Sequence, residues 1–423
     1  MLPVFETYFT RFEAFPQRLS EMVSKNVGII VAIPCYNEPD ILKTLQSLLD
    51  SEKTDCAVEI IVAVNYSETA TQSSKEFNNL TYKELCSFAK TNSSEACKIL
   101  PILASDIPTK QAGVGYARKI AMDEATHRFA SIDNPDGIIV ACDSDSLVAN
   151  NYLREIEQYY VTHSACTAAN IYFEHPLEGE LPSAQYEAIA QYELHLRYYV
   201  EQLKRIGFPY AYHTVGSSFS LRAKTYCRQG GMNKRQAGED FYFLQKLFQT
   251  ENIGEVNTTT IFPSARISDR VPFGTGFAMG KLMSMENPVY LSYSNESFSV
   301  LHDFFSLIPE LRQNDDVKTL YARLHSSLQD FIPFSEFEKK INEIKKNTAT
   351  EVQFRKRFFN WFNGFQIFKY LNFCHAQTFE KQPITQLAAE LVHSTADNTF
   401  AILKEYRTKE KKPACGRDTQ KQN

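Results

Sequence analysis

The sequence feature that most constrains the fold is an uninterrupted apolar run, Val-Gly-Ile-Ile-Val-Ala-Ile, at residues 27–33. A strand that is buried on both faces has no polar positions, so this run is typical of a parallel strand inside a covered sheet. A helical pattern follows, because Pro39 suits a first turn and apolar residues recur on one face from Ile41 to Leu49. This stretch therefore predicts a strand followed by a helix.

The same alternation recurs along the first 175 residues. Further strands are expected at 58–64, 98–104 and 137–142, with helical patterns between them. Strands that alternate with helices indicate an α/β fold with a Rossmann-like, mostly parallel central sheet flanked by helices. Ligands of such sheets bind at the carboxyl ends of the strands. A site is therefore expected in the segments that follow Ile33, Val64, Ala104 and Cys142.

The pattern changes beyond about residue 170. A long aromatic-rich helix is expected at 184–205, a strand of small residues at 214–221 and a helix at 239–248. From about residue 284 the sequence is helical and aromatic, and its Lys-rich end is expected to be disordered. We expect an N-terminal helical segment (1–26), an α/β domain (27–283), a helical C-terminal region (284–405) and a tail (406–423).

Composition narrows the classes of partner. The net charge of −5 and the pI near 6.1 give no basic character, so we expect no nucleic-acid partner. No stretch reaches the roughly 18 apolar residues of a spanning helix. The nine cysteines are scattered and contain no CxxC pair, which favours a reducing cytoplasm. Phe and Trp clusters flanked by Lys and Arg within 284–405 leave two interpretations, a wall of an acceptor site or a peripheral contact with a membrane surface.

Asp143-Ser-Asp145 directly follows the strand expected at 137–142. Alternate residues of extended backbone point to the same side, so both carboxylates can face one cation. Oxygen ligands suit Mg²⁺ or Mn²⁺, which keep open positions for phosphate oxygens. Asp143 and Asp145 are therefore candidate metal ligands, and the alternative is a turn that caps the helix starting near Asn150.

A second acidic motif, Gly238-Glu239-Asp240, opens the helix expected at 239–248. A general base needs a carboxylate within hydrogen-bond reach of the hydroxyl that it deprotonates, and Asp240 and Glu239 are both candidates. Acidic residues at a helix N-terminus also interact favourably with the helix dipole. A purely structural cap is therefore the alternative.

Polar residues beside two other strands can bind a nucleotide. The segment Pro34-Cys-Tyr-Asn-Glu38 lies between the first strand and its helix, where backbone amides and side chains can hold phosphates, although no GxGxxG motif is present there. Lys110 and Arg118 flank the entry to a helix and can neutralise a phosphate or contact a base. The alternatives are a plain strand–helix connection and a solvated basic helix face.

The polar loop at 263–276 carries Arg266 and Arg270 and has glycines near its end. Two guanidinium groups on one loop can clamp a diphosphate when the loop closes. Judged by itself, this loop is better explained as an ordered surface loop with an Arg–Asp pair.

In order and spacing, these motifs resemble those of a family-2 glycosyltransferase with the GT-A fold. The matching segments are Ile33 to Glu38, Gly113 to Arg118, Asp143 to Asp145, Gly216 to Ser220, Gly230-Gly231-Met232 and Gly238 to Asp240. They span roughly residues 27–262. The chain has no QxxRW motif, which argues against a processive polysaccharide synthase.

The resemblance implies a non-processive, inverting transfer of a sugar that depends on Mn²⁺ or Mg²⁺. The donor would be a nucleotide-diphosphate sugar, with UDP-sugars favoured, and the acceptor a hydroxyl of an unidentified glycan, lipid or small molecule. Asp143 and Asp145 would hold the ribose and the metal of the diphosphate, and Asp240, beside Glu239, would take the proton of the acceptor. The nucleoside site would comprise Pro34, Tyr36, Asn37, Glu38, Lys110 and Arg118. Asn65 stands where the family often has acidic residues, so it would contact the base without charge.

Two other functions fit parts of this pattern. A sugar nucleotidyltransferase shares the fold class, but it requires a Gly-rich signature at its first strand, which is absent between Val27 and Asp40. A catalytically silent, glycosyltransferase-like binding protein would not need both acidic motifs to be intact.

Overall fold

The computed structural model describes residues 1–423 except 13, 235–237, 251, 268–273 and 412–423. The chain forms two compact units. Unit 1 comprises residues 1–189, 214–281 and 407–423, and unit 2 comprises residues 190–213 and 282–406. Three helices of the described residues, α6 (Ser183–Arg205), α9 (Thr275–Met283) and α18 (Thr399–Lys411), contribute residues to both units. The domain boundaries expected from the sequence remain a prediction.

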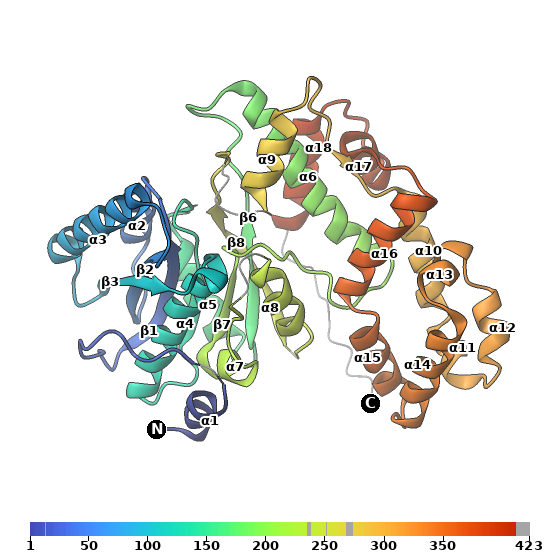
Figure 1. Ribbon diagram of the computed structural model, residues 1–423, viewed down its shortest axis with the longest axis horizontal. Helices are drawn as coiled ribbons and strands as arrows, with labels where there is room; N and C mark the ends of the chain where they lie inside the picture. Colours follow the sequence, from blue (N-terminus) through green and yellow to red (C-terminus); the bar gives the residue numbers. More distant parts are fainter. Residues whose placement is uncertain (13, 235–237, 251, 268–273, 412–423) are drawn as a thin grey trace. The chain divides into compact units, whose positions relative to one another are not determined.

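Unit 1 is built on a sheet that has eight strands in the described residues, in the order β3-β2-β1-β4-β7-β6-β8-β5 (Figure 1). The strands are β1 (Val27–Cys35), β2 (Ala57–Ser67), β3 (Cys97–Ile107), β4 (Ile138–Ala141), β5 (Leu147–Val148), β6 (Ala168–Phe173), β7 (Phe219–Arg222) and β8 (Ile253–Phe262). β1 is parallel to β2 and β4, β2 is parallel to β3, and β6 is parallel to β8. β7 is antiparallel to β4 and β6, and β5 is antiparallel to β8.

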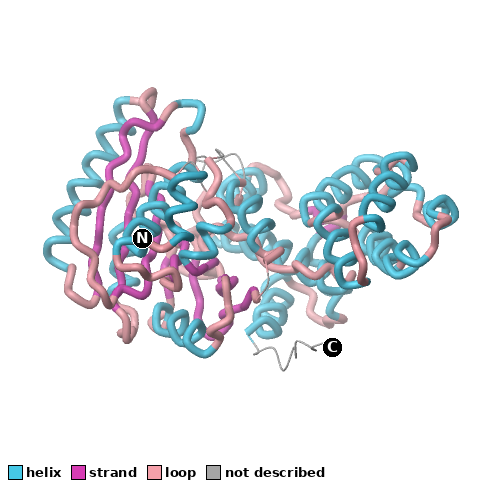
Figure 2. The backbone as a smooth tube through the Cα atoms, turned by 90° about the horizontal axis from the view of Figure 1, so that it is seen from below, coloured by secondary structure: helices cyan, strands magenta, loops and turns pink. Residues whose placement is uncertain are grey.

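Helices flank this sheet (Figure 2). Besides its parts of α6, α9 and α18, unit 1 contains α1 (Pro3–Arg11), α2 (Ile41–Leu49), α3 (Gln72–Asn92), a 3₁₀ turn (Thr109–Gln111), α4 (Val114–Ser131), α5 (Tyr152–Thr162), α7 (Ala223–Arg228) and α8 (Glu239–Leu247). α3 packs on β2 and β3, and α4 packs on β1 and β2. The expected fold class, an α/β sheet flanked by helices with a helical C-terminal region, is confirmed.

Helix α4 is buried on nearly all sides although it is rich in charge. Its buried charged side chains are Arg118, Lys119, Asp123, Glu124 and Arg128. Asp123 accepts hydrogen bonds from the hydroxyls of Tyr8 (2.6 Å) and Tyr226 (2.8 Å), and the backbone amide of Phe15 donates to its other oxygen at 2.7 Å. The N-terminal segment therefore packs against α4, whose first turns reach the candidate site.

Three segments differ from the expectation. Of the strand expected at 214–221, only residues 219–221 pair in the sheet, as part of β7. Residues 216 and 217 instead form a turn, in which the Ser218 amide donates to the Val215 carbonyl at 3.0 Å. Among the described residues of the segment 1–26, only Pro3–Arg11 is helical. Residues 406–411, expected in a disordered tail, continue α18, because Tyr406 is buried and Lys411 pairs with Glu174 at 2.8 Å. The rest of the expected tail, 412–423, lies outside the described residues.

Unit 2 is helical. Besides its parts of α6, α9 and α18, it contains α10 (Asn295–Ser306), α11 (Ile308–Gln313), α12 (Val317–Ala322), α13 (Ser326–Phe331), α14 (Phe334–Lys346), α15 (Glu351–Trp361), α16 (Gly364–Gln377), α17 (Ile384–Val392) and a short pairing of β9 (Leu291–Ser292) with β10 (Gln382–Pro383). Phe358, Phe359 and Phe362 are buried in its core against Phe304 and Phe305. The aromatic cluster that suggested a membrane-facing patch is thus largely internal. None of the described helices has the length and apolar character that a membrane span requires.

Candidate active site

The carboxyl ends of three parallel strands bring the expected donor-side residues to one edge of the sheet. β1 ends at Cys35 and is followed by Glu38, while its neighbour β4 ends at Ala141, two residues before Asp143. Near the end of β2, the buried Asn65 donates from Nδ2 to the Cys35 carbonyl at 2.9 Å. The parallel register therefore brings Asn65, the loop after β1 and the loop after β4 together.

Asn37 shapes the loop after β1. Its backbone is left-handed (φ 48°), a conformation that asparagine adopts more readily than most residues. Its amide donates to Asn78 Oδ1 (3.0 Å), and Asn78 Nδ2 donates back to Asn37 Oδ1 (2.6 Å). Asn37 thus fixes the loop to α3. Pro34 is the penultimate residue of β1, and Tyr36 follows that strand with its side chain partly exposed.

The two carboxylates of the Asp143-Ser-Asp145 motif are partly exposed and pair with different arginines. Asp143 Oδ1 lies 2.6 Å from Arg118 Nη2, and Asp145 Oδ2 lies 3.7 Å from Arg266 Nη2. The backbone between them is held by Thr44, whose hydroxyl donates to the Ser144 carbonyl at 2.9 Å. Each carboxylate therefore already has a cationic partner from another part of the chain.

Arg118 joins the two acidic motifs. Its side chain is 3 % exposed, its Nη2 contacts Asp143, and its Nη1 pairs with Glu239 Oε1. Burial by itself would lower the pKa of Arg118, but Asp143, Glu239 and Asp240 hold that pKa above its ordinary value. Sequence analysis expected Arg118 near a nucleotide; the structure places it between the two acidic motifs.

The Gly238-Glu239-Asp240 motif gives its two acids different surroundings. Gly238 is left-handed (φ 68°) and precedes α8, so Glu239 and Asp240 begin that helix. Glu239 is 1 % exposed, and burial raises its pKa to about 7 although Arg118 opposes the shift. Asp240 is less buried, accepts a hydrogen bond from the Phe241 amide (2.7 Å), and also has a raised pKa because of burial.

Gly216 lies against this carboxylate cluster. A Cβ at residue 216 would lie 2.7 Å from Asp240 Oδ2 and 2.9 Å from Arg118 Nη2, closer than such contacts normally occur. Residue 216 must therefore be glycine for Asp240 and Arg118 to keep these positions. The sequence signal was the run of small residues at 216–218, which indicates close approach of another group.

A second ionic cluster surrounds Arg266. Its Nη2 donates to both oxygens of the buried Glu38 (2.7 and 2.8 Å), and its Nη1 donates to Asp40 Oδ2 at 2.8 Å. A hydrogen bond from Lys43, together with the positive charges of Arg266 and Lys43, lowers the pKa of Asp40. Asp40 was not among the expected site residues, although an acid just before a helix at a strand end is a visible signal.

Among the described residues, the expected Lys110 is not brought into these clusters. Lys110 is exposed in the 3₁₀ turn after β3, a strand separated from β1 by β2. Arg270 lies outside the described residues.

The chemistry of Asp143 and Asp145 fits Mg²⁺ or Mn²⁺, since both supply hard oxygen donors that solvent can reach. Elsewhere in the described residues, as here, no three or more His, Cys, Asp or Glu side chains gather as metal ligands. A divalent ion at this edge would therefore need further oxygen ligands from water or from a bound phosphate.

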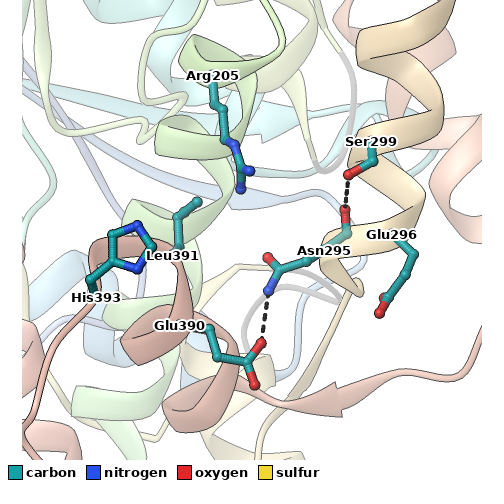
Figure 3. A pocket seen from close by; sticks show the side chains of 7 residues that line it. All are labelled: Arg205, Asn295, Glu296, Ser299, Glu390, Leu391 and His393. Atoms are coloured by element: carbon teal, nitrogen blue, oxygen red, sulfur yellow. Dashed lines mark hydrogen bonds between the residues drawn. The ribbon is translucent and has the colours of Figure 1, made fainter.

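Unit 2 contains a separate cavity. It measures about 420 Å³ and is lined by Arg205, Asn295, Glu296, Ser299, Glu390, Leu391 and His393 (Figure 3). Within it, Asn295 Nδ2 donates to Glu390 Oε2 at 3.0 Å, and the Ser299 hydroxyl donates to the Asn295 carbonyl at 3.2 Å. None of the candidate residues described above lines this cavity.

Comparison with known proteins gives only distant likenesses. No protein-family model matches the chain, and no curated protein matches it. Among solved structures, S. aureus TarS 1–349 in complex with UDP-GlcNAc is similar at 15% identity and a TM-score of 0.37, covering 90% of each chain. S. aureus TarS 1–349 is similar at 13% identity and a TM-score of 0.34, again over 90% of each chain, and its complex with UDP at 12% and 0.36, over 83% of this chain and 92% of TarS. At these values the assignment of function rests on the site geometry.

Proposed function

We propose that this chain is a glycosyltransferase that moves a sugar from a nucleotide-diphosphate sugar to an acceptor hydroxyl. The observation that carries the proposal is the contact of Arg118 with both Asp143 and Glu239. It ties the carboxylate expected on the donor side to the carboxylates expected on the acceptor side. A sugar transfer needs both within reach of one anomeric carbon.

The donor side is the edge formed after β1, β2 and β4. Asn65 and the loop that Asn37 anchors to α3 would contact the nucleoside, with UDP-sugars as the favoured donors. Asp143 and Asp145, partly exposed at the same edge, would face the ribose and the diphosphate. This assignment is supported by the position of the edge at the carboxyl ends of parallel strands, where such folds bind nucleotides.

On the acceptor side, we assign the general base to Asp240. Glu239 is buried and paired with Arg118, whereas Asp240 is more accessible, and its raised pKa makes it a better proton acceptor than an ordinary aspartate. The acceptor oxygen attacks the anomeric carbon as its proton passes to Asp240. The bond from that carbon to the diphosphate breaks, and the nucleoside diphosphate leaves with the electron pair. A single displacement of this kind inverts the anomeric configuration.

A divalent cation, Mn²⁺ or Mg²⁺, would be held by Asp145 and Asp143 and would supply stabilisation of negative charge on the leaving diphosphate. The buried Arg118 keeps a fixed positive charge between Asp143 and Glu239 independently of that ion.

The first test is a thermal-shift panel of UDP, GDP and CDP and their sugars, each with and without Mn²⁺, on the full-length chain. A ligand that binds the folded state raises the unfolding temperature by mass action, by about 2.7 kcal/mol of unfolding free energy at 100 times its Kd. We expect at least one nucleotide-sugar to stabilise the protein with Mn²⁺ present and Asp143→Asn to remove that shift.

Asp55→Asn is the matched control. Asp55 precedes β2, at the opposite edge of the sheet, and pairs with Arg154 on the surface. This variant should keep the ligand-induced shift. A panel without any shift, or a shift that Asp143→Asn leaves unchanged, would contradict the proposed donor site.

A further inference from the structure

Arg266 occupies a position that cannot be explained by packing alone. Its guanidinium group contacts three carboxylates that come from two loops, Glu38 and Asp40 after β1 and Asp145 after β4. The side chain is 30 % exposed, so solvent and ligands can reach it. Arg266 therefore supplies the positive charge that balances the carboxylates at the edge of the sheet where the proposed donor binds.

The local backbone sets this arginine in place. Ser264 Oγ accepts hydrogen bonds from the Arg266 amide and from Arg266 Nε, each at 3.2 Å. The preceding residue, Ala265, is buried, and its carbonyl accepts from Gln185 Nε2 at 2.8 Å. The backbone is thus fixed at Ala265, while the terminal part of the Arg266 side chain is held mainly by ionic contacts.

The positive charge of Arg266 opposes the binding of a divalent cation to Asp145. The Arg266 guanidinium lies 3.7 Å from Asp145, so a divalent ion on that carboxylate would stand close to a positive charge. Like charges at such distances repel, and the cost is large where solvent screening is reduced. A metal ion bound to Asp145 alone must therefore displace or weaken the Arg266 contact.

We infer that Arg266 is the resident counter-cation of the donor site and is exchanged when donor and metal bind together. The inference rests on the proposed function. A divalent ion that binds in the absence of the donor can coordinate Asp145 only by displacing the guanidinium of Arg266. A nucleoside diphosphate supplies a new anionic partner for the displaced guanidinium, since arginine pairs with phosphate as readily as with carboxylate. Donor and metal therefore bind cooperatively, and Arg266 is the source of the cooperativity.

The test measures Mn²⁺ binding directly, by the loss of the electron paramagnetic resonance signal of free Mn²⁺, in the absence and presence of saturating UDP. Full-length wild type is compared with Arg266→Gln and with Ser264→Ala, which removes only the hydroxyl that holds Nε. The matched control is Arg154→Gln, since Arg154 is 32 % exposed and also pairs with two carboxylates, Asp55 and Glu157.

We expect wild type to bind Mn²⁺ weakly without UDP and more tightly with it. Arg266→Gln should bind Mn²⁺ alone roughly three- to tenfold more tightly than wild type, the range expected for loss of a few partly exposed ion pairs. Its gain in Mn²⁺ affinity on adding UDP should shrink correspondingly. Ser264→Ala should fall between wild type and Arg266→Gln, and Arg154→Gln should equal wild type.

If Arg266→Gln binds Mn²⁺ alone no more tightly than wild type while UDP still binds, the inference is overturned and the proposed donor site stands. An equal gain in Arg154→Gln would also overturn it, because the effect would then be one of net charge. If wild type binds neither UDP nor Mn²⁺ in any combination, the proposed function fails and the inference fails with it.

Discussion

Replacing Arg118 with methionine tests the coupling between the two acidic motifs. The change keeps much of the side-chain volume but leaves Glu239, which is 1 % exposed, without its cationic partner. Removing one partner of a buried ion pair costs about 3–5 kcal/mol. At roughly 2–4 °C per kcal/mol for a domain of a few hundred residues, we expect the unfolding temperature at pH 8 to fall by about 10 °C.

The loss should depend on pH in a defined direction. The pKa of Glu239 in the folded protein is about 7, above its ordinary 4.5, so its contribution to stability is present below 4.5 and is lost as pH rises through 7. Arg118 is one of the groups that lower this pKa, so its removal raises the pKa further and steepens the loss at high pH. Arg118→Met should therefore be clearly less destabilising at pH 5.5, where Glu239 is protonated in both proteins.

Thermal unfolding at the two pH values measures this difference. The double variant Arg118→Met with Glu239→Gln should recover most of the stability at pH 8, because no uncompensated buried carboxylate remains at residue 239. Arg154→Gln, which breaks partly exposed pairs, should cost less than about 1 kcal/mol at both pH values. Equal losses for Arg118→Met at pH 5.5 and 8, without recovery in the double variant, would refute the reasoning.

Two further substitutions test how the site is held. Gly216→Ala places a Cβ 2.7 Å from Asp240 Oδ2, so the rate of sugar transfer should fall at least about tenfold. Gly280→Ala is the control and should retain full activity, because its Cβ would meet its nearest neighbour at 3.6 Å. Equal activities of the two variants would show that the close contact at residue 216 is unimportant. Asp123→Asn disturbs the buried group that accepts a hydrogen bond from the Tyr8 hydroxyl. We expect the free energy of unfolding to fall by about 1–3 kcal/mol and proteolysis near the N-terminus to become faster. Unchanged proteolysis would argue against a role of Asp123 in anchoring the N-terminal segment.

The sequence predicts the central strands because a strand that is buried on both faces consists almost entirely of apolar residues. The apolar run at 27–33 becomes β1, and the strands expected at 58–64 and 98–104 become β2 and β3. β8 (Ile253–Phe262) carries polar residues at several positions, so no apolar run in the sequence identifies it as a strand. The insertion of β7 between β4 and β6 joins segments far apart in the chain, which local patterns do not specify.

The candidate site could be predicted as a set of motifs but not as a network. The sequence places Asp143 after a strand and Glu239 at a helix start, and the structure agrees on both positions. The helix face that bears Arg118 could equally have been a solvated basic surface. It is buried instead, because Asp143, Glu239 and Gly216 lie against Arg118. Asp143 is 25 residues away in the chain and Glu239 is 121 residues away, so local patterns do not specify the pairing of Arg118 with both motifs.

The central claim is that the two acidic motifs form one sugar-transfer site, and release of nucleoside diphosphate from nucleotide-sugars tests it most directly. With Mn²⁺ and a panel of donors and acceptors, wild type should release nucleoside diphosphate from at least one donor. Asp240→Asn should slow that release by about 10²–10⁴-fold, the range for loss of a general base, while Asp55→Asn should not change it. Turnover that survives in both Asp240→Asn and Asp143→Asn, or its absence from wild type with every donor and acceptor, would contradict the account.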